Sequence, residues 1–412
     1  MKPFFYSLIA CLLGQIATAA DPPAIDPPNY DEAAIPEYTL PDSLTFEDGT
    51  PVTSAEQWPK RRAEILNLFS EHIYGFVPEG VSNQIFPTVR KEIDFLDGTA
   101  TLKEVRIHFA KADGPFMDLM IVAPKGVEKG SPTFLGYNFG GNHITHPSTE
   151  ISLPESWMRP SRTPGAVVDD KATEVGRGST TRWPLQKFID NQMALATIYY
   201  GDVDPDFDDG FENGAHSLFG KPEKPTEWGS IATWAWALSR ALDYLETEPL
   251  CDAEKVAVFG HSRLGKTSLW AGATDERFAM VISNNSGCGG AALNRRRIGE
   301  RVARINTSFP HWFNDKFNAY NENENALPVD QHQLMALMAP RPLHIGSASE
   351  DLWADPKGEY LAGAHATPVY ELLGKQGMGK DIRYHLRAGK HGVTDFDWDQ
   401  YINTFKTEVL AD

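Results

Sequence analysis

The sequence is most informative at residues 256–266, which read VAVFGHSRLGK. An apolar run of strand length, Val256–Phe259, leads into a Gly-His-Ser turn and then into residues that favour a helix. Small residues let the chain turn sharply, so that the Ser262 hydroxyl projects above the end of the strand. The following helix N terminus offers free N–H groups and a positive dipole for a developing negative charge. The stretch therefore predicts a nucleophilic serine, although Gly265 follows one place later than in the common G-x-S-x-G motif.

Apolar runs of strand length occur on both sides of this turn. The early runs follow one another closely, whereas the later ones alternate with helical stretches. The runs are 105–109, 119–123, 133–137, 194–200, 256–259, 280–283, 343–347 and 382–386, and the helical stretches include 54–73, 231–245, 334–338 and 359–373. This order predicts a mostly parallel central sheet with helices on both faces. Together with the turn at Ser262, it predicts an α/β-hydrolase fold, a three-layer α/β sandwich.

The partners of the serine are expected downstream, because such folds place the triad in the order Ser, acid, His. One late strand leads into a segment with three carboxylates. We expect Asp351 to be the acid, with Glu350 and Asp355 as alternatives, and Asp355 suits the N-cap of the next helix. The last predicted strand leads into Gly-Lys-His-Gly, a loop able to carry His391 over the serine. His391 would accept the serine proton, while the acid holds the imidazole in the correct tautomer.

The first residues have the pattern of an export signal. A positive start, an apolar run and an Ala-Thr-Ala-Ala end predict a signal peptide over residues 1–20 and a secreted or periplasmic protein. Cys11, in Leu-Ile-Ala-Cys, is similar to a lipoprotein processing site, but it precedes the end of the apolar run, so a lipid anchor is the less favoured alternative. Residues 21–52 are rich in proline and acids and predict an extended arm. We expect the catalytic domain to occupy residues 53–412.

Composition excludes several classes of function. The 412 residues contain 38 Lys and Arg and 56 Asp and Glu, a formal net charge of −18, which argues against nucleic-acid binding. No later apolar run is long enough to span a membrane. Cys251 and Cys288 flank opposite ends of predicted parallel strands, so we expect two free thiols. His143 and His146 lack a third ligand at zinc spacing, and we expect no metal and no cofactor.

Two features suggest donors for an oxyanion. Residues 138–143, NFGGNH, follow a predicted strand and are similar to the glycine-rich loop that supplies a backbone donor in esterases. Arg263 directly follows the serine, and charged donors form stronger hydrogen bonds than neutral ones. We therefore expect this loop to supply a second backbone donor for the oxyanion.

Several motifs resemble those of carbohydrate esterase family 15, the glucuronoyl esterases. Residues 260–266 are similar to the family signature G-[CH]-S-R-x-G-K, and further similarity, chiefly to bacterial members, lies in 283–290, 295–300, 350–356 and 390–392. The resemblance extends from about Glu56 to the C-terminal helix. It implies a secreted serine esterase that cleaves esters between the 4-O-methyl-glucuronic acid of glucuronoxylan and lignin alcohols, through an acyl-enzyme on Ser262.

The same resemblance implies roles for further residues. Arg263 would bind the oxyanion through its backbone N–H and its guanidinium. Lys266, Glu300 and Trp353 match positions that line the sugar pocket. The chain departs from the fungal branch, in which a glutamate serves as the triad acid at the position of Asn285. Because an asparagine cannot be an anionic partner, this departure shifts the role of the acid to Asp351.

Two other functions are compatible with these residues. An acetyl xylan esterase would use the same scaffold and triad, but would not need Lys266 and Glu300 to bind the acid part of the ester. A glycan-binding protein without activity would agree with Asn285, but not with the retention of Ser262 and His391. The preferred alcohol and the length of the xylan chain stay open, and we expect a monomer.

Overall fold

A computed structural model describes residues 27–411, so the predicted signal peptide and Cys11 lie outside the described residues. The larger of its two sheets has nine strands in the order β1-β2-β3-β7-β4-β8-β9-β10-β11. Their bounds are β1 Ile85–Phe95, β2 Ala100–Phe109, β3 Phe116–Pro124, β4 Ser131–Asn138, β7 Ala194–Tyr199, β8 Cys251–His261, β9 Met280–Asn284, β10 Leu343–Ala348 and β11 Ile382–Arg387. All neighbouring pairs from β7 to β11 are parallel, whereas β1–β2, β2–β3 and β3–β7 are antiparallel. The other sheet is a short hairpin of β5 (Val167–Val168) and β6 (Lys171–Ala172).

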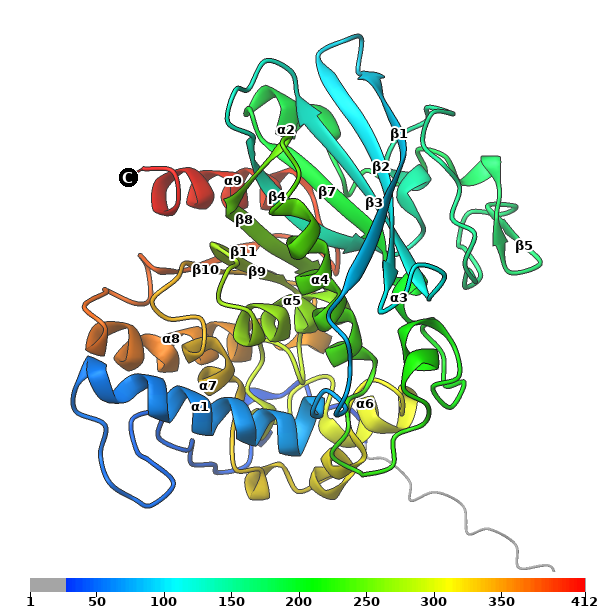
Figure 1. The fold of residues 1–412 in the computed structure, drawn as a ribbon. Helices are drawn as coiled ribbons and strands as arrows, with labels where there is room; N and C mark the ends of the chain where they lie inside the picture. The colour runs from blue at the N-terminus through cyan, green and yellow to red at the C-terminus, as the bar shows by residue number, and fades with distance from the viewer. Residues whose placement is uncertain (1–26, 412) are drawn as a thin grey trace, which may run out of the picture.

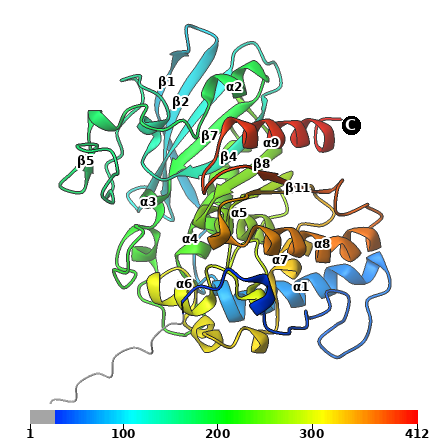
Figure 2. The ribbon, with the colours of Figure 1, turned by 180° about the vertical axis from the view of Figure 1, so that it is seen from behind.

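Helices cover both faces of the large sheet (Figures 1 and 2). One face carries α1 (Trp58–Phe69), α4 (Ser230–Leu245), α5 (Arg263–Thr274), α7 (Gln331–Ala336) and α8 (Pro356–Leu372), and the other carries α2 (Leu185–Asp190) and α9 (Asp395–Glu408). Each face has its own apolar core, because the strands bury side chains in both directions. The sandwich predicted from the sequence is confirmed.

The predicted strands all lie in this sheet, with Tyr200 instead beginning the short helix α3 (Tyr200–Val203). Strand β1 was not predicted. It pairs with β2 at one edge of the sheet, and most of its side chains are partly or fully exposed. An edge strand with little buried surface lacks the apolar run by which the other strands were found.

The two cysteines of the described chain, Cys251 and Cys288, are both buried and free, as predicted. Cys251 is the first residue of β8, and Cys288 follows β9. Burial raises the pKa of both thiols, which leaves them unreactive. Within residues 27–411, no helix is long and apolar enough to cross a bilayer.

The segment 27–52 contacts the loops beside the cavity described below. Glu32 forms ion pairs with Arg296, at 2.5 Å, and with Lys357, at 2.6 Å. The Gly299 N–H donates to the carbonyl of Asn29 at 2.8 Å. These contacts connect the N-terminal segment to the residues immediately before Glu300.

A buried carboxylate connects α8 to the loop after β9. Glu359 accepts hydrogen bonds from the backbone N–H groups of Ser286, at 2.7 Å, and Gly287, at 3.0 Å, and from the Ser347 hydroxyl. Burial raises the pKa of Glu359 to about 8, because the charged form loses its hydration. The side chain thereby holds the loop that follows Asn285.

We predict that the free energy of unfolding of the wild type falls as the pH rises from about 4.5 to about 8, and that it falls less in Glu359→Gln. A carboxyl with a higher pKa in the folded state binds its proton more tightly when folded. It therefore stabilises the fold fully below the unfolded pKa, and this contribution is lost as the pH rises through the folded value. One such group changes the slope by at most about 1.4 kcal/mol per pH unit.

Urea denaturation of both proteins at several pH values measures this difference. The exposed Glu254→Gln is the matched control and should keep the wild-type slope. Equal slopes for Glu359→Gln and wild type would contradict the prediction.

Candidate active site

The turn between β8 and α5 holds Ser262 in a strained conformation, with φ 60° and ψ −130°. Two glycines make the turn possible. A Cβ on Gly260 would lie 1.8 Å from the carbonyl oxygen of Leu264, so only glycine fits there. A Cβ on Gly265 would lie 2.9 Å from the Cβ of Ser286. The late position of the second glycine is thus explained by the close approach of α5 to the segment after β9.

The structure brings Asp351 and His391 together. Asp351 follows β10 and His391 follows β11, and the carboxyl ends of these parallel neighbours meet at one edge of the sheet. His391 Nδ1 donates to Asp351 Oδ2 at 2.6 Å. The Asp351 side chain is 5% exposed and that of His391 is 40% exposed. A buried carboxylate thus fixes the tautomer of a histidine that is open to substrate.

Asn285, at the position of the fungal glutamate, donates from Nδ2 to the same Asp351 oxygen at 2.9 Å. The asparagine therefore stabilises the negative charge of Asp351 instead of supplying one. Its backbone is in the left-handed region, at φ 48°, which asparagine adopts more readily than most residues.

The two alternative acids make other contacts. Asp355 caps α8 by accepting from Gly358 N–H at 3.0 Å, and it forms an ion pair with Arg296 at 2.8 Å. The capping role expected for Asp355 is thus confirmed. Glu350 contacts the histidine loop through its backbone, whose N–H donates to the carbonyl of Gly389 at 2.9 Å. Within residues 27–411, neither carboxylate hydrogen-bonds to His391.

One cavity of about 550 Å³ collects the predicted residues. Those that line it are Ser262, Arg263, Lys266, Glu300, Asp351, Trp353 and His391. Within the described chain, the Ser262 hydroxyl has no hydrogen-bond partner. Serine and base are often loosely aligned before substrate binds, and their contact tightens in the complex.

His261 packs against His391, with ring centroids 4.5 Å apart. Its Nδ1 donates to Asn284 Oδ1 at 2.6 Å. Burial, followed by the nearby charge of His391, holds the pKa of His261 well below its usual value. His261 therefore stays neutral and does not repel the imidazolium that forms on His391.

The floor of the cavity contains a buried ion pair. Lys266 Nζ lies 3.2 Å from Glu300 Oε2 and donates to the carbonyl of Ser286 at 2.6 Å.

Trp353 is 38% exposed at the rim of the cavity, which excludes a core position. The Glu300 N–H donates to the carbonyl of Trp353 at 2.9 Å, so one backbone bond joins the loops that carry these two residues.

Several cavity residues were missed by sequence reasoning, among them Asn285 as a lining residue, Arg304, Ser308, Phe309 and Trp312. Arg304 and Ser308 lie four residues apart on α6 (Val302–Ser308), so they share one face of this helix, whereas Glu300 precedes its N-cap. This four-residue spacing is visible in the sequence and could have predicted that the two side chains point in the same direction.

The glycine-rich loop 138–143, expected to supply an oxyanion donor, is absent from the residues that line the cavity. Gly141, at φ 90°, directs the chain into a short 3-10 turn, and Asn138 Nδ2 donates to Asn142 Oδ1 at 2.7 Å. The loop closes on itself, and none of residues 138–143 lines the cavity. His143 in this loop is buried, which lowers its pKa to about 4. Within residues 27–411, no cluster of three or more His, Cys, Asp or Glu side chains is arranged to hold a metal.

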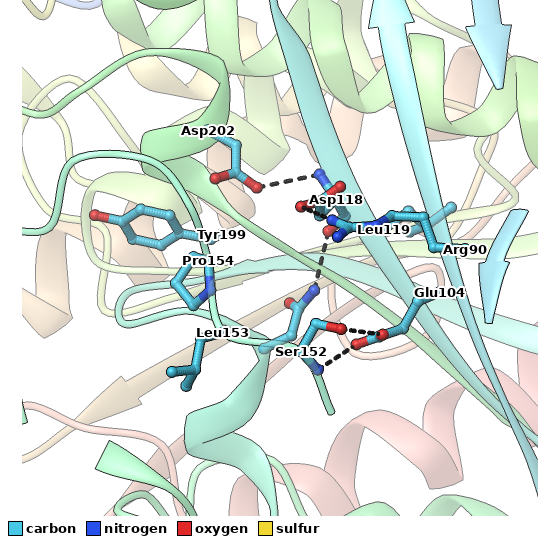
Figure 3. Close-up of a pocket in the computed structure, with 10 residues that line it drawn as sticks. Arg90, Glu104, Asp118, Leu119, Ser152, Leu153, Pro154, Tyr199 and Asp202 are labelled. Carbon is cyan, nitrogen blue, oxygen red and sulfur yellow. Dashed lines mark hydrogen bonds and ion pairs between the residues drawn. The ribbon is translucent and has the colours of Figure 1, made fainter. Parts of the chain in front are cut away.

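A second cavity, of about 20 Å³, lies between β3 and the segment after β7 (Figure 3). It is too small for a sugar. Asp202 Oδ2 accepts from the Asp118 N–H at 3.1 Å, whereas Asp202 Oδ1 is buried without a partner in the described chain. Burial, with a smaller effect of the Asp118 charge, raises the pKa of Asp202 to about 7.

Known proteins share this sequence and arrangement. A family model described as glucuronyl esterase, fungi, matches residues 184–374. Carbohydrate esterase MZ0003, from an unknown prokaryotic organism, is 52% identical over 394 residues, which cover 91% of this chain and 90% of the relative. A 4-O-methyl-glucuronoyl methylesterase of Wolfiporia cocos is 28% identical over 377 residues, or 87% of this chain and 78% of the relative. The solved structure of a promiscuous CE15 esterase from the marine bacterial metagenome is 51% identical, with a TM-score of 0.87, and the match covers 93% of this chain and 100% of that chain.

The likeness to the prokaryotic esterase extends over nine tenths of both chains. The residues matched by the family model include Ser262 and Asp351. The chain therefore belongs to carbohydrate esterase family 15, the glucuronoyl esterases.

Proposed function

We propose that this enzyme, a carboxylic ester hydrolase, cleaves esters between the (4-O-methyl-)glucuronic acid of glucuronoxylan and lignin alcohols, with Ser262, His391 and Asp351 as its triad. The observation that carries the proposal is the cavity that combines Ser262 and the Asp351–His391 pair with the buried Lys266. Ser262, His391 and Asp351 supply the groups that ester cleavage needs, and Lys266 supplies a donor for sugar hydroxyls.

In the first half of the reaction, the Ser262 oxygen attacks the ester carbonyl carbon while His391 Nε2 accepts the hydroxyl proton. The tetrahedral oxyanion is stabilised by the backbone N–H and the guanidinium of Arg263. When the intermediate collapses, the C–O bond to the alcohol breaks, and His391 returns the proton to the leaving alcohol. The uronoyl group is then bound to Ser262 as an ester.

In the second half, a water molecule attacks the acyl-enzyme with His391 again as the base, and the free uronate leaves. Asp351 keeps the proton on His391 Nδ1 and stabilises the imidazolium in both halves. The Lys266–Glu300 pair binds hydroxyls of the sugar, and Trp353 contacts the ring at the rim. All proton transfers thus pass through one histidine.

We predict that Ser262→Ala and His391→Ala each lower kcat on methyl and aryl glucuronate esters by at least about 10⁴-fold, because each removes a reacting group. A panel of glucuronate, galacturonate and acetyl esters measures the activity. Wild-type inactivity on every uronate ester, together with good turnover of acetylated xylan, would replace the proposal by an acetyl xylan esterase.

We predict that Asp351→Asn lowers kcat by about 10³–10⁴-fold, because the histidine loses the partner that holds its tautomer. Asn285→Glu in the same chain should restore part of the activity, since the Asn285 side chain lies 2.9 Å from the Asp351 oxygen that accepts from His391. Steady-state kinetics on a glucuronate ester measure both effects. A loss below tenfold for Asp351→Asn would contradict the prediction and would indicate that Glu350 or Asp355 is the triad acid.

We predict that Lys266→Met combined with Glu300→Gln lowers kcat/KM on glucuronate esters by about 10–100-fold, the loss expected for a charged hydrogen bond. The double change leaves no buried charge unpaired. Phenyl acetate, whose acyl group has no sugar hydroxyls, is the matched control substrate and should lose less than threefold. Equal losses on both substrates would contradict a role in uronate binding.

We further propose that residues 1–20 are a signal peptide, that residues 21–52 form an arm of the mature enzyme, and that residues 53–412 form its catalytic domain. We predict that the exported protein begins at Asp21 and carries no lipid. Intact mass measurement of wild type and of Cys11→Ser tests this, and the two should be processed alike. A lipid mass on wild type that is absent from Cys11→Ser would instead show an anchor.

A further inference from the structure

Asp206 lies in a buried polar cluster beside the cavity. It belongs to the acidic segment that follows β7 and α3, and its side chain is 1% exposed. Hydrogen bonds saturate both of its oxygens. Its donors are Arg159 Nη1 at 3.0 Å, the Tyr200 hydroxyl at 2.9 Å and Arg263 Nη1 on Oδ2, and His311 Nε2 at 3.1 Å and Trp312 Nε1 at 2.9 Å on Oδ1.

This environment keeps Asp206 charged. Burial by itself would raise its pKa, but the hydrogen bond from His311 and the charge of Arg263 outweigh burial and hold the pKa well below its usual value. Asp202, four residues earlier, is also buried, but no arginine of the described chain hydrogen-bonds to it, and its pKa is raised to about 7. The two aspartates therefore differ in their partners, because Asp206 accepts hydrogen bonds from the guanidinium groups of Arg159 and Arg263.

Arg263 is held on two sides by this cluster. Asp206 binds Nη1, and the guanidinium carbon lies 4.5 Å from the centroid of the Trp312 ring and 5.1 Å from that of Phe309. These two rings are stacked 3.7 Å apart. Trp312 therefore contacts both the acid and the arginine. Arg263 Nε is buried and, within the described chain, has no hydrogen-bond partner.

We propose that Asp206 is a positioning residue for ester cleavage, which holds the Arg263 guanidinium beside Ser262 for the oxyanion. This inference rests on the role of Arg263 in the proposed function. An arginine side chain has several rotatable bonds and loses rotamer entropy when it is fixed. Asp206 fixes it before substrate arrives, so that the donors are already oriented when the charge develops.

A carboxylate beside Arg263 has a second, opposing effect. It partly neutralises the guanidinium, which weakens attraction to an oxyanion. If that effect dominated, removal of the Asp206 charge would raise kcat. We expect orientation to dominate, because the hydrogen bond to Asp206 engages Nη1 alone among the guanidinium nitrogens. The sign of the change in kcat decides between the two effects.

The test is a double-mutant cycle on a methyl or aryl glucuronate ester. Asp206→Asn should lower kcat by about 10–100-fold, a typical loss when a supporting hydrogen-bond partner is removed, and should change KM by less than twofold. In the Arg263→Ala background, the same substitution should change kcat by less than threefold, because there is no guanidinium to position. Asp202→Asn, a buried aspartate of the same segment, is the matched control and should leave kcat within threefold of wild type.

Tyr200→Phe covers the case in which Asp206→Asn does not fold. It removes one buried donor to Asp206 at a residue that does not line the cavity, and should lower kcat about two- to fivefold only when Arg263 is present. An unchanged or raised kcat for Asp206→Asn, or equal losses with and without Arg263, would overturn the inference while the proposed function stands. Full activity of Arg263→Ala would instead refute the oxyanion role of Arg263, and the inference with it.

Discussion

The strained turn at Ser262 is the constraint on which the site depends. A φ of 60° at a serine is unfavourable by about 1–3 kcal/mol, and the turn persists because the structure around it is rigid. Ser262 N–H donates to Asn284 carbonyl at 2.8 Å, and Gly265 N–H donates to Ser262 carbonyl at 2.8 Å. β9 and α5 thus hold the turn from both sides. The buried strand and helix offset the strain through apolar burial, and the hydroxyl remains at the sheet edge where the loops after β10 and β11 arrive.

Charge in this acidic chain is arranged in pairs around the cavity. His391 is held by Asp351, Lys266 by Glu300, and Arg263 by Asp206. Buried pairs contribute little net stability, because desolvation offsets their attraction. They do fix the direction of long or rotatable side chains, which an active site requires. These three pairs balance their own charges, which suits a substrate whose reacting carboxyl is a neutral ester.

Much of the fold could be predicted because buried strands contain short runs of mainly apolar residues. The runs that form β2, β3, β4 and β7 to β11 all had this property, whereas the exposed edge strand β1 did not. A site residue could be predicted where its type and its position after a strand are compatible with few roles other than catalysis. A serine after Gly-His in a strand-to-helix turn and a histidine after the last strand meet that condition. The glycine-rich loop 138–143 did not, because glycine at a sharp turn is compatible with many loop geometries.

The sequence by itself determined the fold class and the family, since these depend on local pattern and on short motifs. Only the tertiary structure selected Asp351 over Glu350 and Asp355 as the partner of His391, because all three carboxylates share one loop and differ only in direction. It also brought Asp206 to Arg263, across 57 residues of chain. The physical reason is the same in both cases: local propensity sets the elements, whereas the direction of a side chain depends on what packs against it from elsewhere.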